Sequence, residues 1–207
     1  SSLPSGVTFA RASTASYFGS DGLLKINGAA SGAARIDYDP VTKISRGLLV
    51  EEQRTNSAKY SNDFSNATWG KSNCTVTQNV VGPDGLTNSA WTMTENTSAG
   101  IHRMYQSSQP NSAFVASIYV KDIDARYVYG AVYTTNEPTV VGFDLQAGKV
   151  TGKYIDSATM SESAPPTITP IGNGWFRLTI SLNVSASSFV YWGLNSANAA
   201  LRFEPSY

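Results

Sequence analysis

Short alternating segments dominate the hydrophobic pattern of the second half of the chain. The clearest runs over residues 172–184, where apolar side chains at even positions from Phe176 to Leu182 alternate with polar ones after an Asn-Gly pair. Alternation with a period of two is typical of a half-buried β-strand. Five more strands follow from the same reasoning, two of them joined as a hairpin. They are residues 114–121, 126–134, 189–195 and the hairpin 140–154, which turns at Gln146-Ala147-Gly148.

Helical periodicity is nearly absent from the sequence. No stretch of about a dozen residues keeps apolar positions three and four apart without an intervening Gly or Pro. Strand signals recur at short spacing with turn residues between them. The pattern therefore predicts an all-β protein, either an antiparallel β-sandwich or a jelly roll.

Residues 1–56 differ from the rest and are predicted to form an irregular N-terminal extension that contains β-hairpins. Ser20-Asp21-Gly22 marks one turn, and the Tyr-Asp-Pro-Val-Thr-Lys stretch from Tyr38 marks another. These segments hold too few large apolar residues for a core of their own. We expect them to lie against the sandwich, assigned to residues 57–207, or against neighbouring subunits.

The charge balance excludes several classes of partner. The 207 residues carry 15 Lys+Arg and 15 Asp+Glu, and only 14% are charged. Such a surface has no electrostatic footprint for nucleic acid or an anionic membrane. No apolar run reaches the ~18–20 residues that a membrane span needs. We therefore expect neither nucleic-acid binding nor membrane insertion.

Candidate catalytic groups are scarce. Cys74 is the only cysteine and His102 the only histidine. Cys74 is interpreted as a small strand residue and His102 as a polar surface residue, because the usual nucleophile–His and metal–His constellations lack their partners. We therefore predict a protein that is not an enzyme.

The stretch GLLVEEQRTN, residues 47–56, raises the question of a paired-carboxylate site. Glu51 and Glu52 are adjacent, so their side chains diverge on a strand and do not face each other on a helix. A glycosidase instead needs two carboxyls ~5–10 Å apart across one substrate. We predict that one Glu is solvated and the other pairs with a nearby arginine, so that some of Glu51, Glu52 and Arg54 form ion pairs or hydrogen bonds that fix the joint. The candidates are Arg11, Arg35, Arg46 and Arg54.

Five segments, in order along the chain, resemble a run found in bacteriophage virion proteins. They are FARASTASYFGSDGLLK, RIDYDPVTKISRGLLVEEQRTN, DFSNATWGKSN, VGPDGLTNSAWTMTE and IGNGWFRLTISL. The resembling family comprises phage head spike fibres, tail fibres and related adhesins, and head spikes of gene transfer particles look similar. Its members combine an N-terminal segment with a carbohydrate-binding-module-like jelly roll.

The resemblance implies a non-catalytic protein on the virion surface of a phage or phage-like particle. It implies binding of host cell-surface polysaccharide, contacts with other virion proteins, and a homo-oligomer, since spikes and fibres are commonly trimers. It also places residues 47–50 at the join, as a strand docking onto the jelly roll. The C-terminal YWGLNSANAALRFEPSY departs from the family's Trp-Gly-Ala-Gln-Leu-Glu, so no contact is carried over from that Gln and Glu.

Exposed aromatic strand faces are the candidate glycan site, because pyranose rings stack on aromatic rings and sugar hydroxyls bond to polar side chains. If the strands share one sheet, their outward side chains combine into one aromatic and basic platform. The alternative is that these tyrosines pack across strands. The predicted ligand-binding residues are Tyr119, Lys121, Tyr127, Tyr129, Tyr133 and Arg177.

Other candidates are assigned as follows. Trp69 and Trp192 are predicted to lie in the core, and Trp175 is left unassigned. No cofactor is predicted. A structural calcium ion stays open, because jelly rolls of this kind often carry one. The carboxylates to test first are Asp63, Asp84 and Asp144.

Two further hypotheses compete with the adhesin. One is a purely structural virion decoration or connector, whose tyrosine face packs against another subunit. The other is a polysaccharide-degrading enzyme, which lacks a catalytic constellation in the sequence. The glycan, the host and the position on the particle do not follow from the sequence.

Overall fold

The protein is all-β, as predicted. The structure, a computed structural model, describes residue 6 and residues 14–27, 34–52, 54–109, 111–134, 138–155, 157 and 159–195. These residues form antiparallel strand pairs and contain no helix. It follows that no described helix is long and apolar enough to cross a membrane.

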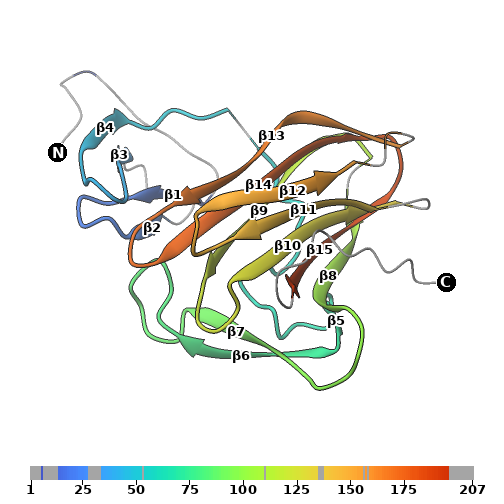
Figure 1. Cartoon of the computed structure of the whole chain (residues 1–207). Coiled ribbons are helices and arrows are strands. Elements are labelled where there is room, and N and C mark those ends of the chain that lie inside the picture. Colours follow the sequence, from blue (N-terminus) through green and yellow to red (C-terminus); the bar gives the residue numbers. More distant parts are fainter. Residues whose placement is uncertain are drawn as a thin grey trace.

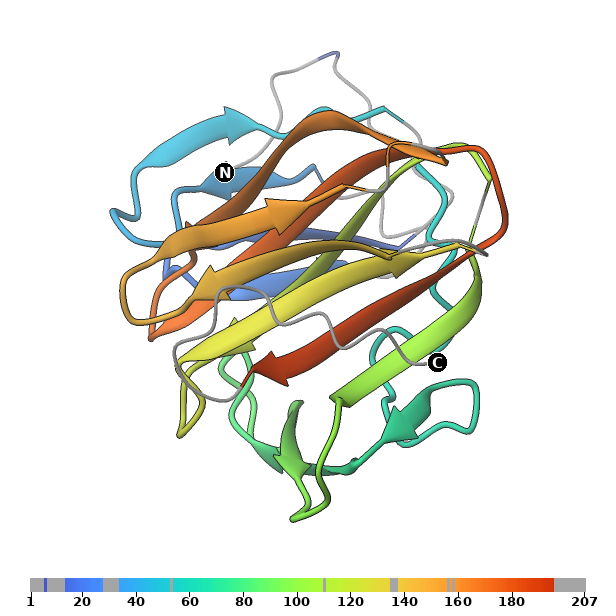
Figure 2. The same ribbon diagram turned by 45° about the vertical axis from the view of Figure 1, so that its right-hand side comes forward.

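A six-stranded antiparallel sheet forms the front layer in Figure 2. Consecutive neighbours are not always consecutive in the chain, since the last strand lies between β10 and β8. In spatial order, the strands are β12 (Lys149–Tyr154), β11 (Pro138–Asp144), β10 (Tyr127–Tyr133), β15 (Ser188–Asn195), β8 (His102–Gln109) and β5 (Gly70–Ser72).

A three-stranded antiparallel sheet forms the second layer. Its order is β13 (Met160–Pro170), β14 (Trp175–Val184) and β9 (Ala113–Lys121). The turn before β14 has Asn173 and Gly174 at positive φ, 53° and 78°, as the predicted Asn-Gly signal requires. The edge strand β13 contains Pro165 and Pro166, and its register with β14 shifts on both sides of Ala164.

The two sheets pack face to face over one hydrophobic core and so make a β-sandwich (Figure 1). The six-stranded sheet contributes Phe143, Val132 and Trp192, and the three-stranded sheet contributes Leu178 and Leu182. All five side chains are buried. Trp69 is buried too, so both tryptophans predicted to lie inside do so.

Two small hairpins precede the sandwich. They are β1 (Ala15–Phe18) with β2 (Leu24–Asn27), and β3 (Ile36–Tyr38) with β4 (Ser45–Leu48). Asp39 closes the second turn by accepting hydrogen bonds from the backbone N–H groups of Val41 and Thr42. These bonds hold the pKa of Asp39 at about 2.

The hairpins lie against the sandwich, which is one of the two predicted arrangements (Figure 1). Phe18 packs against Trp175 and Ile171 at one end of the three-stranded sheet. The backbone N–H of Leu24 donates to the carbonyl of Pro83 at 3.0 Å. The boundary between an extension and a second domain at residue 56 stays a prediction.

GLLVEEQRTN is a structural joint. The Glu51 carboxylate lies 2.6 Å from Nη1 of Arg35, a residue only 5% exposed, and the same nitrogen donates to the carbonyl of Ser16. Glu52 pairs with Arg54 at 2.7 Å on the surface. The predicted pair of one Glu with a nearby arginine is therefore present at Glu51, while Glu52 lies in solvent and pairs there with Arg54.

The expected strand at residues 47–50 is only partly correct. β4 ends at Leu48, and it pairs with β3 instead of docking onto the sandwich. Val50 is 79% exposed. The backbone of this stretch is held by β3, while its side-chain link to the first hairpin runs through Arg35.

A further hairpin, β6 (Cys74–Val80) with β7 (Ala90–Glu95), lies below the six-stranded sheet in Figure 1. Beside it, Phe64 contacts the rings of Trp69 and Trp91 edge to face, at centroid distances of 5.0 and 6.4 Å. This aromatic group anchors the connecting segment 57–69 on the sandwich.

Candidate functional site

The six residues predicted to bind a ligand do not form one platform. Tyr127, Tyr129 and Tyr133 belong to the six-stranded sheet, whereas Tyr119, Lys121 and Arg177 belong to the three-stranded sheet. Both sets alternate with core residues, so both point outward. Because the sheets pack core face to core face, the two sets lie on opposite sides of the sandwich. The strands do not share one sheet, and the single platform expected from the sequence is wrong.

On the three-stranded sheet, the tyrosine is packed under other residues. Tyr119 joins the small cluster of Phe18, Ile171 and Trp175, and burial raises the pKa of its phenol. The sequence left Trp175 unassigned, and the structure buries it in this cluster. The hairpin β1–β2 therefore covers part of this face.

The two cations of that face remain at the surface. Arg177 lies opposite Tyr119 and donates from Nη2 to the hydroxyl of Ser117 at 3.4 Å. Lys121 lies opposite Trp175 at the end of β9 and is exposed. With Tyr119 only partly exposed and packed against the Phe18 cluster, this face presents isolated charges beside one tyrosine instead of a group of rings.

On the six-stranded sheet, aromatic side chains from three neighbouring strands gather on the outer face. We call this group, together with one arginine, the aromatic face. It consists of Arg103 and Tyr105 on β8, Tyr129 and Tyr133 on β10, and Phe189 and Tyr191 on β15.

Tyr191 is the centre of the aromatic face. Its ring lies 5.4 Å from that of Tyr105, 6.2 Å from that of Tyr133 and 6.1 Å from that of Phe189. Tyr191 is buried, the other three rings are partly exposed, and Phe189 is the most open at 36%. The outward rings therefore form a surface around a fixed central ring.

Two glycines allow the tyrosine rings to lie down on the sheet. Gly193 stands opposite Tyr129, and a Cβ built on it overlaps the Tyr129 ring. Gly70 stands opposite Tyr105, and a Cβ there overlaps the Tyr105 ring in the same way. A missing side chain on the neighbouring strand thus provides the space for each ring, which favours a flat surface over projecting rings.

Arg103 lies over these rings. Its guanidinium carbon is 4.3 Å from the centroid of Tyr191 and 5.7 Å from that of Tyr105. Both distances are within the range of a cation–π contact. Arg103 is half-buried, and its Nε is fully buried without a hydrogen-bond partner.

Tyr129 carries a second buried polar atom without a partner, its phenolic oxygen. Burial raises the pKa of Tyr129 to about 12, although the nearby charge of Arg103 acts in the opposite direction. Tyr129 therefore stays a neutral phenol at physiological pH and can donate a hydrogen bond.

Tyr127 stands apart from the aromatic face, at the end of β10. Its ring lies under the guanidinium of Arg126 at 4.9 Å. Arg126 in turn makes two hydrogen bonds to the buried carboxylate of Asp144, at 2.9 and 2.7 Å. This arrangement explains Tyr127 as part of a closed ion-pair network.

The three carboxylates considered for calcium are engaged by protein donors. Asp144 is held by Arg126, which, with the backbone N–H groups of residues 146 and 147, lowers its pKa to about 2. Asp63 accepts from Ser65, and Asp84 accepts from Ser89. Within the described ranges, no group of three or more His, Cys, Asp or Glu side chains is placed to hold a metal ion.

Cys74 and His102 are both occupied in structural contacts. The thiol of Cys74 donates to the carbonyl of Arg103 at 3.2 Å, and burial raises its pKa. His102 Nδ1 lies 2.8 Å from the carbonyl of Asn73. Neither group is poised as a nucleophile or base in this arrangement.

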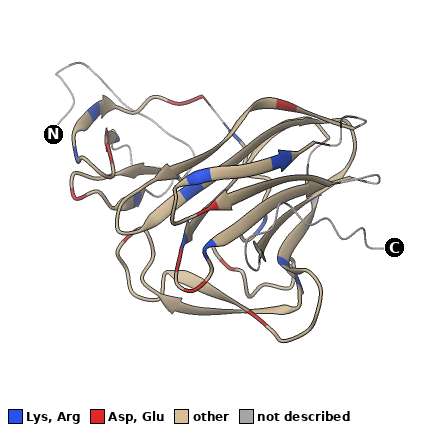
Figure 3. Cartoon of the chain, viewed as in Figure 1, with Lys and Arg blue, Asp and Glu red and all other residues tan. Residues whose placement is uncertain are grey.

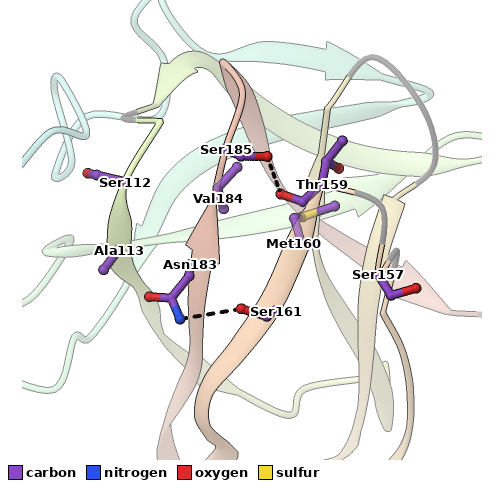
Figure 4. A pocket seen from close by; sticks show the side chains of 9 residues that line it. All are labelled: Ser112, Ala113, Ser157, Thr159, Met160, Ser161, Asn183, Val184 and Ser185. Atoms are coloured by element: carbon purple, nitrogen blue, oxygen red, sulfur yellow. Dashed lines mark hydrogen bonds between the residues drawn. The ribbon is translucent and has the colours of Figure 1, made fainter.

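A shallow pocket of about 410 Å³ opens at the end of the three-stranded sheet (Figure 4). Hydroxyl and amide side chains dominate its lining, and two of its pairs are hydrogen-bonded: Asn183 to Ser161, and Ser185 to the carbonyl of Thr159. Its described lining residues include no charged side chain and no member of the aromatic face.

The sequence missed the centre and the cation of the aromatic face. Tyr191 lies next to Trp192, whose core position already implied that Tyr191 points outward. Arg103 and Tyr105 flank Met104 in the same alternating way, but residues 102–109 were not recognised as a strand. The pattern that indicates these outward positions is alternation around a single buried residue, Trp192 in one strand and Met104 in the other. The sequence prediction included that pattern only at Trp192.

Sequence comparisons identify no relatives: no protein-family model matches the chain, and no curated protein matches it significantly.

Proposed function

We propose that this protein is a non-catalytic virion-surface module of a spike or fibre, and that it binds host cell-surface polysaccharide on the aromatic face. The observation that carries the proposal is the gathering of five aromatic rings on the outer side of one sheet, around Tyr191. Sugar rings present apolar C–H faces that stack on such rings, while their hydroxyls bond to phenols and guanidinium groups.

The arrangement of strands supports the finer assignment to a jelly roll of the carbohydrate-binding-module kind. The chain passes from β8 to β9, back through β10 to β12, across to β13 and β14, and back to β15. Such repeated crossing between two antiparallel sheets is typical of Greek-key and jelly-roll sandwiches. The fold alone does not specify the ligand.

The virion location rests on the five phage-like segments of the sequence. Two of them contain the joint of Arg35 with Glu51 and the packed group of Phe64 and Trp69, so the resemblance includes residues with structural roles. A homo-oligomer, with a trimer as the expected state, belongs to the same proposal. Light scattering during size-exclusion chromatography measures it directly.

The test of the proposal is binding to polysaccharide through the aromatic face. We expect the purified protein to bind at least one bacterial surface polysaccharide on a glycan array or in cell pull-down. The double variant Tyr133→Ala/Phe189→Ala should bind at least about 10-fold more weakly, because two stacking contacts are lost.

The matched control is Val115→Ala, an exposed apolar residue on the opposite sheet. It should bind like the parent protein. If no polysaccharide or cell is bound while the double variant blocks incorporation into particles, the face is a subunit contact and the structural alternative replaces the adhesin. Release of reducing ends from a bound polysaccharide would overturn the non-catalytic assignment.

A further inference from the structure

Of the six arginines among the described residues, four are paired with a carboxylate and two are not. Four described arginines lie within 4.0 Å of a carboxylate, even where the arginine is largely exposed. These pairs are Arg35 with Glu51, Arg46 with Asp39, Arg54 with Glu52, and Arg126 with Asp144.

Arg103 is one of the two unpaired arginines, and it lies where an unpaired charge is less favourable. It is half-buried among aromatic rings, and no carboxylate of the described residues pairs with its guanidinium. Arg177 also has no carboxylate, but it is exposed on the other side of the sandwich, where water solvates it. Partial desolvation raises the value of a counter-charge, so the site at Arg103 favours an anion more than the site at Arg177 does.

The polar atoms of the aromatic face that lack partners lie in one row across three strands. Tyr129 is opposite Gly193, and Gly193 is opposite Arg103. Because Gly193 has no side chain, the Tyr129 ring lies over it toward Arg103. The phenol oxygen and the Arg103 Nε are both buried without a hydrogen-bond partner.

Both groups in this row can donate hydrogen bonds, and the only acceptor side chain in the row, the neutral Tyr129 phenol, supplies no counter-charge for Arg103. The protein's other inward-held arginine, Arg35, also has a buried Nε without a partner, but its Nη1 has two acceptors, the Glu51 carboxylate and the Ser16 carbonyl, so its charge is paired. Among the described residues, the aromatic face has no equivalent carboxylate, so an external ligand is the natural source of a counter-charge there. A planar guanidinium matches the two oxygens of a carboxylate particularly well.

We infer that the polysaccharide bound on the aromatic face is acidic, and that a sugar carboxylate of the uronic-acid type pairs with Arg103 beside the Tyr129 hydroxyl. The inference rests on the proposed function, because it names the class of glycan for the same face. Tyr191 and Tyr105 hold the cation in place, and the open rings of Tyr133 and Phe189 stack the neighbouring sugar units.

The experiment compares matched ligands on the intact protein. An array carries uronate-containing polysaccharides, the same polysaccharides after chemical reduction of their carboxyl groups, sulfated polysaccharides, and neutral dextran. We expect binding to at least one uronate polymer, at least about 10-fold weaker binding to its carboxyl-reduced form, and weakening as salt increases.

Arginine variants test which residue supplies the positive charge that binds the polysaccharide. Arg103→Gln should weaken uronate binding at least about 10-fold and abolish its salt dependence, while Arg103→Lys should retain part of the affinity as a point charge. Arg177→Gln is the control cation on the opposite face and should leave binding unchanged. Circular dichroism and melting curves verify that each variant is folded.

The outcomes separate the two proposals. Binding of neutral or carboxyl-reduced polymers as tightly as uronates leaves polysaccharide binding in place and overturns the acidic-ligand inference. If the protein prefers sulfated polymers to uronates, the ligand is still an anion, but its assignment as a carboxylate is overturned. Unchanged uronate affinity in Arg103→Gln overturns the assigned residue. Absence of binding to every polymer overturns both proposals.

Discussion

Tyr119 and Tyr129 both occupy outward positions on their strands, and each has an arginine near it, yet their surroundings differ. Tyr119 is packed with Phe18 and Trp175 under the N-terminal hairpin, and its neighbour Arg177 extends into solvent. Tyr129 lies flat over a glycine, with an arginine fixed on the adjoining rings. The same residue types therefore serve packing on one side and form a candidate binding surface on the other.

The difference depends on which segments cover each sheet. The hairpin of β1 and β2 lies on the three-stranded sheet, where Phe18 packs against the same cluster as Tyr119. The aromatic face instead packs mainly against its own members, through cross-strand ring contacts. Charge reinforces the contrast only locally, since Lys, Arg, Asp and Glu are scattered over the molecule without a dominant patch (Figure 3).

The variant with the largest expected effect tests whether the two sheets, and so the two faces, unfold as one cooperative unit. Phe143→Ala removes a fully buried ring between the sheets and should cost about 3–5 kcal/mol of unfolding free energy. Guanidinium unfolding, followed by tryptophan fluorescence and by far-UV circular dichroism, should give a single coincident transition. Val115→Ala, an exposed control, should change stability by no more than about 0.5 kcal/mol. Two separated transitions would show that the faces unfold independently.

A smaller effect should be confined to the aromatic face. Gly193→Ala places a methyl group where the Tyr129 ring lies, and we expect a loss of about 1–3 kcal/mol from overpacking. Denaturant unfolding measures this loss. If the clash is with that ring, Tyr129→Ala in the same chain should recover part of it, giving non-additive values in a double-mutant cycle. Additive losses would place the strain elsewhere.

The next prediction concerns the arginine beside the six-stranded sheet that does have a carboxylate partner, Arg126, which pairs with Asp144. The pKa of Asp144 is lowered to about 2, so its ionised form contributes stability above its unfolded value of about 3.9. That contribution is lost as pH falls through about 2. Asp144→Asn should therefore flatten the decline of melting temperature between about pH 4 and pH 2.

Part of the acid dependence should survive in that variant, because the pKa of Asp39 is also lowered to about 2. Asp124→Asn, on an exposed loop, provides the matched control and should retain the parent's pH profile. An unchanged profile in Asp144→Asn would mean that the Arg126 pair does not contribute to folding in this pH range.

The smallest effect is expected on the three-stranded sheet. Arg177→Gln and Lys121→Gln remove exposed charges whose contacts are weak, and each should change stability by no more than about 0.5 kcal/mol. Neither should alter polysaccharide affinity on the array. A 10-fold loss of binding in either variant would move the candidate site to the opposite side of the sandwich.

Most of the strongly alternating strands could be predicted from the sequence. β14, β9, β10, β15 and the β11–β12 hairpin follow from period-two patterns and turn residues, with outer ends within three residues of those observed. Such signals are local, since alternation and a turn depend only on neighbours in the chain. The ion pair of Glu51 with an arginine followed from similar local geometry.

The strands that escaped prediction lack that local signal. β13 contains Pro165 and Pro166, which argue against a strand, and it is tolerated because its register with β14 is interrupted there. β8 alternates Arg103, Met104 and Tyr105, in which only Met104 is strongly apolar. Its strand character comes from pairing with β15, almost 90 residues later in the chain.

The split of the predicted site could not be foreseen for a related reason. β9 and β10 are consecutive in the chain, but β9 pairs with β14 and β10 pairs with β11 and β15. Long-range pairing decides the side of the sandwich on which a side chain emerges, and a single sequence does not specify that pairing. Tyr119 and Tyr129 thus end on opposite surfaces despite lying ten positions apart.

The adjacent prolines of β13 also bear on how the molecule behaves when crowded. Neither proline has an N–H group to donate, and both lie where the pairing of β13 with β14 is interrupted, so this edge strand carries a gap in its donors. A strand of another chain cannot continue the hydrogen-bond ladder across that gap. The gap therefore disfavours fibrillar aggregation by strand addition along this edge.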